Sequence, residues 1–192
     1  MQIKNKGKIK MKKFFCLILC IIFAFSLSAC DKSAGKKSDH SVDVVYYAKL
    51  GQLNDLDYRL GDDIESTKTK LSETADDHGG SNYFDYTSGD YTVMTDGTVY
   101  CSYKTDDSAA GITHIAKSDD VYGFAIGTIS TQVRETMSTM GYDATEREAT
   151  RDEIFFLPAA ADMTVLEYQI KENKVLFIFQ EHALGTTLIT KK

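Results

Sequence analysis

The stretch "RLGDDIESTKTKL", from Arg59 to Leu71, reads as a glycine followed by a capped amphipathic helix. Asp62 is placed to accept a hydrogen bond from the backbone at Glu65 while Glu65 reaches back, as in a capping box. The stretch "AIGTISTQVRETM", from Ala125 to Met137, keeps the glycine and the apolar positions at helical spacing. Two helices that open in the same way indicate an internal repeat.

Strand-like segments follow both helices in the same order. After the first helix, strands are expected at Tyr83 to Ser88, Tyr91 to Thr95, Thr98 to Lys104 and from Ile112 onward. After the second helix, which Gly141 closes, strands are expected at Ile154 to Leu157, Thr164 to Ile170, Lys174 to Gln180 and Gly185 to Lys192. The segment Ala144 to Glu153 is compatible with a second short helix.

Two short polar pairs predict hairpin turns at equivalent places. Asp96-Gly97 predicts a type I′ turn, because both residues tolerate positive φ, and Glu172-Asn173 is the corresponding centre in the second half. These pairs lie 76 positions apart (172 − 96), whereas the opening glycines Gly61 and Gly127 lie 66 apart (127 − 61). The second copy therefore carries ten extra residues.

We predict an α+β fold of two tandem helix–antiparallel-sheet repeats, residues 44–118 and 119–192, with the helices packed on one face of a meander sheet. The opposite face would then be an exposed surface suited to binding a partner. Chance similarity of two helix–hairpin units is the alternative, because few positions match by identity.

A glycine-led helix followed by a four-stranded meander, twice over, resembles the repeat of the β-lactamase-inhibitor protein family. "LGDDIESTKTKL" and "IGTISTQVRETM" resemble the helix-opening motif of that family and of related small lipoproteins of outer-membrane barrel assembly. The resemblance implies that the sheet face and the hairpin turns engage another protein, which makes candidate contacts of Asp96, Gly97, Glu172 and Asn173. The chain lacks tryptophan, and its folded part cannot form the inhibitor's disulfides. These departures count against inhibitory activity but not against the fold.

The N-terminal 29 residues have the pattern of an export signal. Six lysines precede an apolar run, Phe14 to Ala29, that is too short to span a membrane stably. The run ends in Leu27-Ser28-Ala29-Cys30, which resembles the bacterial lipobox and implies cleavage before Cys30 and lipidation of that cysteine. The alternative is an ordinary secretory signal that happens to carry a cysteine.

Lipidation would anchor the chain to a bilayer without spanning it. The segment Asp31 to Asp43 is polar and free of aromatic residues, which is typical of a flexible tether. Only Cys101 remains in the folded part, so no intrachain disulfide is available. The expected location is the outer side of a cell membrane, as on a Gram-positive cell surface. Met11, which two lysines follow, is as good a start as Met1.

The mature chain would be strongly acidic. Loss of the six signal lysines lowers Lys+Arg from 22 to 16 against 28 Asp+Glu, which changes the formal charge from −6 to −12 (16 − 28). A chain of this charge repels phosphate groups, so we do not expect nucleic acid as a partner.

No local motif of catalysis, metal binding or cofactor binding occurs in the sequence. The four histidines lack the short spacing of zinc ligands, and Cys101 lies in a strand pattern typical of a buried structural thiol. We therefore expect a protein without metal or cofactor that is not an enzyme. An enzyme whose site is assembled from distant residues is the remaining alternative.

The segment Tyr83 to Tyr91, "YFDYTSGDY", is the richest candidate for binding. Exposed tyrosines supply a large contact area at little entropic cost. The hypothesis is that Tyr83, Phe84, Tyr86 and Tyr91 contact a protein or peptide; the alternative is that these rings are half-buried against cross-strand neighbours. A second functional alternative is a small-ligand-binding or sensory accessory lipoprotein of the cell envelope, with a pocket between sheet and helices.

Overall fold

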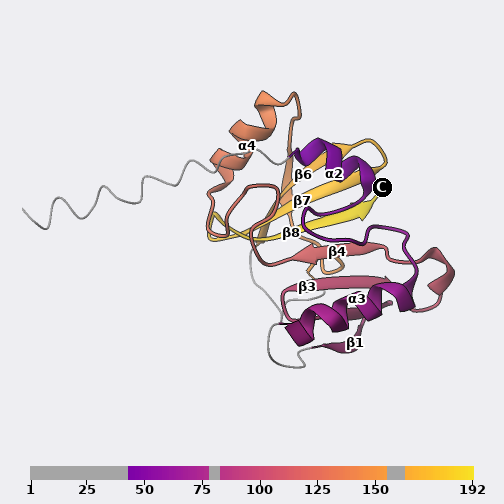
Figure 1. Cartoon of the computed structure of the whole chain (residues 1–192). Coiled ribbons are helices and arrows are strands. Elements are labelled where there is room, and N and C mark those ends of the chain that lie inside the picture. The colour runs from indigo at the N-terminus through magenta and orange to yellow at the C-terminus, as the bar shows by residue number, and fades with distance from the viewer. Residues whose placement is uncertain (1–42, 78–82, 155–162) are drawn as a thin grey trace, which may run out of the picture. The chain divides into compact units, whose positions relative to one another are not determined.

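In the described part of the chain, an antiparallel sheet of eight strands forms the framework of the fold, which is α+β. Figure 1 shows how the helices lie against this sheet. In this computed structural model, residues 43–77, 83–154 and 163–192 are described, and all belong to one compact unit, Asp39–Lys192. The strands are β1 (Phe84–Ser88), β2 (Tyr91–Thr95), β3 (Val99–Lys104), β4 (His114–Lys117), β5 (Thr145–Glu148), β6 (Met163–Ile170), β7 (Asn173–Gln180) and β8 (Ala183–Lys191).

Two meanders make up this sheet, whose strand order is β1-β2-β3-β4-β8-β7-β6-β5. Strands β1 to β4 form the first meander and β5 to β8 the second, and β4 pairs with β8 where they meet. The pair Ala116–Leu188 lies at this junction. The strands predicted between Tyr91 and Lys104 and between Thr164 and Lys192 are confirmed. Strands β6, β7 and β8 are buried on both faces for most of their length.

Within the described residues, three α-helices accompany the sheet: α2 (Val44–Leu50), α3 (Ile64–Asp77) and α4 (Ser130–Thr139), with a 3-10 turn, η1 (Ser108–Ala110). Helix α2 contacts β6 and β7, and α3 contacts β2 (Figure 1). The sequence did not predict α2, which is only seven residues long and too short for a clear helical period. Asp43 begins it by accepting a hydrogen bond from the backbone N–H of Tyr46 at 2.9 Å.

The cap of α3 lies one residue later than predicted. Asp63, not Asp62, accepts from the backbone N–H of Ser66, at 2.9 Å. The Asp62 carboxylate accepts instead from the backbone N–H of Arg59, at 3.0 Å. Its carbonyl oxygen accepts from the N–H of Ile112 at 3.1 Å and is therefore used outside the helix.

The segment Ala144 to Glu153 does not form a short helix. Its first part is strand β5, in which Arg147 pairs with Val165, and the N–H of Ala149 donates to the carbonyl of Met163 at 2.9 Å. Pairing with β6 thus overrides the local helical preference. Of the strand predicted at Ile154 to Leu157, Ile154 lies in a bend and the rest is outside the described residues.

Both hairpin turns differ from their predicted form. At Asp96-Gly97 only Gly97 has positive φ (92°), so the turn is not type I′. Asp96 accepts instead from the N–H groups of Thr98 and Val99, at 2.8 and 2.7 Å. In the second hairpin Ile170 pairs with Asn173, so its centre is residues 171–172, one residue earlier than predicted.

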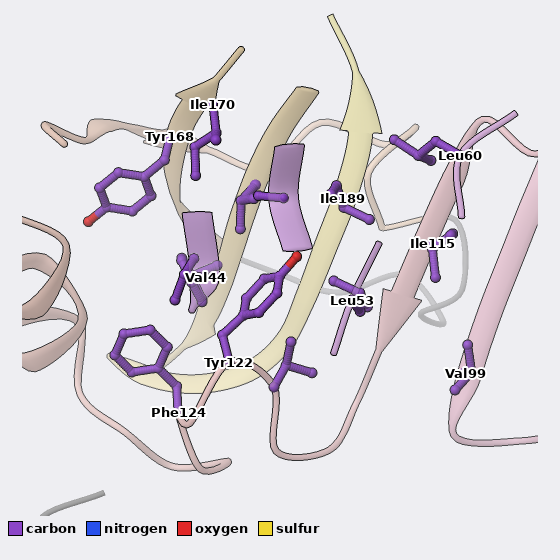
Figure 2. Packing of buried hydrophobic residues seen from close by; sticks show 14 of the residues in the cluster. Val44, Leu53, Leu60, Val99, Ile115, Tyr122, Phe124, Tyr168, Ile170 and Ile189 are labelled. Carbon is purple, nitrogen blue, oxygen red and sulfur yellow. The ribbon is translucent and has the colours of Figure 1, made fainter. Parts of the chain in front are cut away.

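The main hydrophobic core lies against one face of the sheet. Figure 2 shows Val44, Leu53 and Tyr122 gathered against the strands that carry Ile189 and Tyr168. The cluster also contains one row of cross-strand neighbours: Met94, Cys101, Ile115, Ile189, Val175 and Tyr168. Helices α3 and α4 contribute Leu71, Val133 and Met137 to the same cluster.

The opposite face carries a second, smaller apolar cluster. Its buried members are Val93, Ala116, Met163, Val165, Leu176, Ile178 and Leu188. Partly buried residues from two parts of the chain pack on this cluster. They are Tyr86 and Tyr100 of the first meander, and Ala149 and Ile154, which follow β5. This face, expected to be exposed, is therefore partly covered.

Candidate functional site

Five aromatic rings gather on this second face, on strands β1 to β4. We call them the aromatic surface: Phe84, Tyr86, Tyr91, Tyr100 and His114. Strand register brings them together, because Phe84 pairs with Thr95, which pairs with Tyr100. Side chains of directly paired residues share a face.

The rings of the aromatic surface contact one another in pairs. Phe84 and Tyr86 stack with centroids 5.9 Å apart, and Tyr91 meets His114 edge-on at 5.0 Å. Tyr100 donates from its hydroxyl to the carbonyl of Gly97 at 3.3 Å. These pairs hold the rings in place, so little side-chain entropy remains to be lost on binding.

The aromatic surface combines one exposed ring and four partly buried rings with an aliphatic floor. Phe84 is 51% exposed, an unusual value for phenylalanine, while Tyr86, Tyr91 and Tyr100 are half-buried. Val93 and Ala116 beneath them are fully buried. Burial raises the pKa of Tyr86, so its hydroxyl stays neutral.

His114 contributes no charge to this surface at neutral pH. Burial lowers its pKa to about 4, an effect that Asp152 and Glu153 oppose and Lys104 reinforces. Its Nδ1 lies 3.1 Å from the hydroxyl of Ser102 and 3.0 Å from that of Thr113.

Tyr83 lies away from the aromatic surface. It packs against the main core, and the ammonium group of Lys68 lies 6.0 Å from the centre of its ring. Burial, with Asp85 and Glu65, raises its pKa to about 12. Successive side chains of a strand point to opposite faces, so Tyr83 and Phe84 lie on different faces. Of the four predicted aromatic residues, Phe84, Tyr86 and Tyr91 lie together and Tyr83 lies apart.

The two hairpin turns are not brought together. Through successive strand pairs, Thr95 at the end of β2 lies level with Glu167 of β6. Strand β6 runs in the direction opposite to β2 and reaches its own turn three residues later, after Ile170. The turns therefore project from opposite ends of the sheet. Gly97 and Glu172 are exposed, and of the two only Gly97 adjoins the aromatic surface.

Asp96 and Asn173 are buried and used structurally. The Asp96 carboxylate accepts two backbone N–H groups of its own turn. The side-chain amide of Asn173 donates to the carbonyl of Ala48, at the end of α2, at 2.8 Å. Neither side chain is therefore available to a partner without disrupting the fold.

Tyr100 and His114 belong to the surface but were missed in the sequence. Tyr100 alternates with Cys101 in its strand, and the burial expected for Cys101 placed Tyr100 on the other face. His114 had no such signal, because only the pairing of β3 with β4 brings it beside Ser102.

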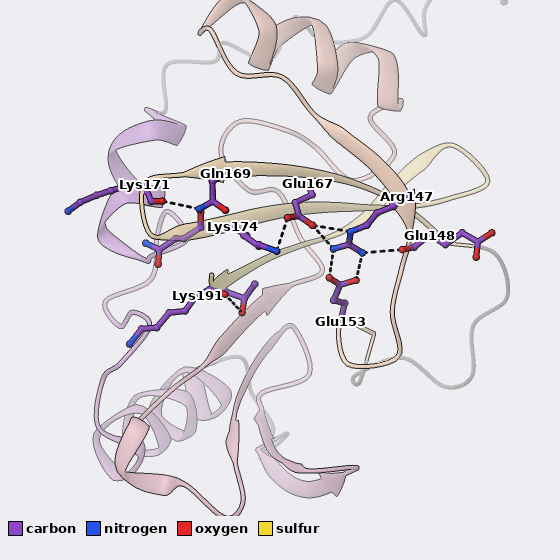
Figure 3. Close-up of polar contacts among 10 residues, drawn as sticks. Arg147, Glu148, Glu153, Glu167, Gln169, Lys171, Lys174 and Lys191 are labelled. Carbon is purple, nitrogen blue, oxygen red and sulfur yellow. Dashed lines mark hydrogen bonds and ion pairs between the residues drawn. The ribbon is translucent and has the colours of Figure 1, made fainter.

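A polar cluster lies on the same face in the second meander (Figure 3). We call Arg147, Glu153, Glu167 and Lys174 the Arg147 network. The guanidinium donates to Glu153 at 2.7 Å and to Glu167 at 2.9 Å, and Lys174 pairs with Glu167 at 2.8 Å. The hydrogen bonds that Arg147 donates to the Glu153 carboxylate raise the pKa of its guanidinium. The network holds residues 149–154 over the second apolar cluster.

No metal centre occurs among the residues that the structure describes, and the depression found among them is open. The space between sheet and helices is filled by buried side chains such as Tyr122 and Phe124. An open depression of about 350 Å³ on α4 is lined by Glu135, Thr136, Thr139 and Met140. No three His, Cys, Asp or Glu side chains of residues 43–77, 83–154 and 163–192 are grouped to hold a metal ion. Cys101 is fully buried, and burial raises the pKa of its thiol.

Comparison of the chain with protein families, with curated proteins and with solved structures finds no match. Within the described ranges, no helix has the length and apolar character needed to cross a membrane. The aromatic surface is thus the feature from which function is inferred.

Proposed function

We propose that the protein is a lipid-anchored, non-catalytic module that binds another protein or a peptide through the aromatic surface. The observation that carries the proposal is the gathering of five rings over a buried aliphatic floor, with Phe84 half exposed at the sheet edge. Rigid aromatic side chains around an apolar centre are the usual anchors of protein interfaces.

The proposal includes two tandem repeats, residues 44–118 and 119–192, with the helices on one face of the sheet. The opening glycines support it, because Gly61 and Gly127 have φ of 87° and 88°. A residue other than glycine rarely adopts this conformation.

Backbone hydrogen bonds at the two glycines also match. Gly61 donates to the carbonyl of Ile112 at 2.7 Å, and Gly127 donates to that of Leu184 at 2.8 Å. In return, Ile112 donates to Asp62 and Leu184 to Thr128, the residues after the glycines. Ile112 and Leu184 are 72 positions apart (184 − 112), as are Ala116 and Leu188, which pair directly. This matched spacing supports a pseudo-twofold axis at that pair.

The pseudo-twofold relation suggests why the first repeat is the binding half. Strands β1 and β2 are joined by two residues, Gly89 and Asp90, whereas residues 149–162 join β5 to β6. Residues 149–154 cover the second apolar cluster in their own half. The two-residue β1–β2 turn supplies no equivalent segment over the rings of β1, which supports the first repeat as the binding half.

The resemblance to the β-lactamase-inhibitor family supports a module that binds another protein through a sheet face. We propose binding but not inhibition, because the chain lacks the tryptophans and disulfides of the inhibitor. The proposed location is the outer side of a cell membrane, with the lipid on Cys30 and residues 31–42 as a tether. Residues 30–42 lie outside the described part of the chain, and Asp43, which was predicted to end the tether, caps helix α2.

The test is capture of partners from envelope extract by the full chain, purified in mild detergent, with identification by mass spectrometry. Phe84→Ala/Tyr86→Ala should lower capture at least about tenfold, because exposed aromatic anchors dominate interfaces. Tyr46→Ala is the matched control, since Tyr46 is 56% exposed on α2. Equal capture by all three proteins, or no specific partner, would contradict the proposal.

A further inference from the structure

The two edges of the sheet are protected to different degrees. Edge strand β5 has four residues, of which Glu146, Arg147 and Glu148 are charged, and Glu146 pairs with Arg134 of α4. Edge strand β1 has five residues and a single charge, Asp85, which lies 3.7 Å from Lys68. Charged side chains and prolines normally prevent an edge from pairing with another chain. Strand β1 therefore has the weaker protection.

The backbone of β1 presents unpaired groups at this edge. Asp96 donates to Val99, and Thr105 donates to Asp90, which sets the alternation of hydrogen bonds between β2 and β3. The even-numbered residues on the β2 side therefore form hydrogen bonds to β3, and the odd-numbered residues form hydrogen bonds to β1. Their partners in β1 are residues 84, 86 and 88. The N–H and C=O groups of Asp85 and Thr87 point outward. Within the described ranges, no strand pairs with them.

The aromatic surface begins at this same edge. Phe84 and Tyr86 stand on β1 itself, and their stacked rings would flank every second side chain of a strand added beside it. In strand addition, main-chain hydrogen bonds provide affinity and alternate side chains provide specificity. The edge and the surface thus suit one extended segment.

The charge around the edge selects a basic segment. Residues 83–107 contain five aspartates and one lysine, Lys104. Asp96 is buried in its turn, but Asp85, Asp90, Asp106 and Asp107 are exposed. Asp85 faces the main core and pairs with Lys68, whereas Asp90, Asp106 and Asp107 lie at the end of the sheet where the β1–β2 turn is. A Lys or Arg side chain over the rings of β1 would be attracted by these last three carboxylates and by the faces of the rings.

We propose that β1 accepts an extended, basic segment of a partner protein as a ninth strand, with alternate side chains over the aromatic surface. This inference rests on the proposed function, because it states how the partner of the aromatic surface binds.

The probe is a synthetic peptide of about twelve residues in which arginine alternates with valine, beside a peptide with glutamate at each arginine. Binding to the full chain in mild detergent is measured by fluorescence anisotropy. The basic peptide should bind at least about tenfold more tightly, and its affinity should fall as salt rises from about 50 to about 500 mM. Hydrogen exchange should show new protection at the amides of Asp85 and Thr87.

Proline variants separate the two edges. Thr87→Pro removes an outward N–H from β1 and should lower the affinity of the basic peptide at least about tenfold. Glu148→Pro is the matched control, since Ala149 donates to β6 and residue 148 therefore points outward from the other edge. It should leave binding unchanged.

Two N-methylated peptides test the strand without altering the protein. Methylation of the odd-numbered or the even-numbered peptide nitrogens blocks one edge of the added strand, so one version should lose binding and the other keep it. Equal binding of both, or no binding of the basic peptide, would overturn the inference, as would full affinity of Thr87→Pro. If Phe84→Ala/Tyr86→Ala still lost the envelope partner, the proposed function would stand without strand addition.

Discussion

Asn173 joins two parts of the chain 125 residues apart. Its side-chain amide donates to the carbonyl oxygen of Ala48 at 2.8 Å, beside the backbone N–H of Gly51, which donates to the same oxygen at 3.1 Å. That carbonyl ends helix α2, where carbonyl groups lack partners within the helix. Asn173 therefore attaches the N-terminal helix to the β6–β7 turn.

Asn173→Ala should lower the free energy of unfolding by about 1–3 kcal/mol, because a buried carbonyl loses a hydrogen bond. The neighbouring Glu172→Ala is the control and should change it by less than about 0.5 kcal/mol, since that side chain is exposed. Urea unfolding of the three proteins measures both values. Equal stability of all three would show that the contact with Ala48 contributes little.

At the scale of elements, the connection after β5 is held by charge. Burial raises the pKa of Glu153, but hydrogen bonds from Arg147 and Thr150 outweigh it and leave the pKa below its usual value. Burial also raises the pKa of Glu167, but hydrogen bonds from Lys174 and Arg147 outweigh burial and leave that pKa below its usual value. Carboxylates with lowered pKa values stabilise the folded state in their charged form.

The Arg147 network should make stability depend on acid pH. Because both folded pKa values lie below the unfolded value of about 4.3, the stabilisation is present above that pH and is lost as pH falls through the lowered pKa values. Arg147→Met should destabilise the protein by roughly 2 kcal/mol at neutral pH. It should also reduce the loss of stability between about pH 5 and pH 3.

Urea unfolding across this pH range measures both effects. Arg134→Met is the matched control, because its pair with Glu146 is exposed and such pairs contribute little. An acid dependence in Arg147→Met as steep as in the unchanged protein would contradict the prediction.

At the scale of the whole molecule, the two halves use the same face of the sheet differently. The second half covers its apolar cluster with residues 149–154, and the first half presents the aromatic surface. In the proposed lipid-anchored form, the acidic charge expected for the cleaved chain would keep this surface away from anionic headgroups.

Cys30→Ser should move the protein from the membrane fraction to the soluble fraction or the medium, because the thioether to lipid cannot form. The control is Cys16→Ser/Cys20→Ser, which replaces cysteines expected to leave with the signal. Cell fractionation and labelling with a radioactive fatty acid measure the outcome. Membrane retention of Cys30→Ser would argue for another mode of attachment.

Sequence patterns correctly predicted those elements whose conformation depends on residues close by in the chain. Strand β2 begins and ends at the predicted residues, Tyr91 and Thr95, because alternation is a local property. Glycines with positive φ marked the approach to both helices, since few other residues adopt that conformation. The helix expected at Ala144 to Glu153 was wrong, because pairing with β6 decided that segment.

The sequence by itself determined the α+β class, most strands and the burial of Cys101, because spacing and turn preference act within a few residues. Only the tertiary structure decided that Tyr83 lies apart from the aromatic surface and that Tyr100 and His114 belong to it. It also decided that Asn173 forms a hydrogen bond to the end of α2. Strand register across distant segments makes these choices, since it sets which side chains become neighbours. The difference between the β1 and β5 edges follows from the same long-range pairing.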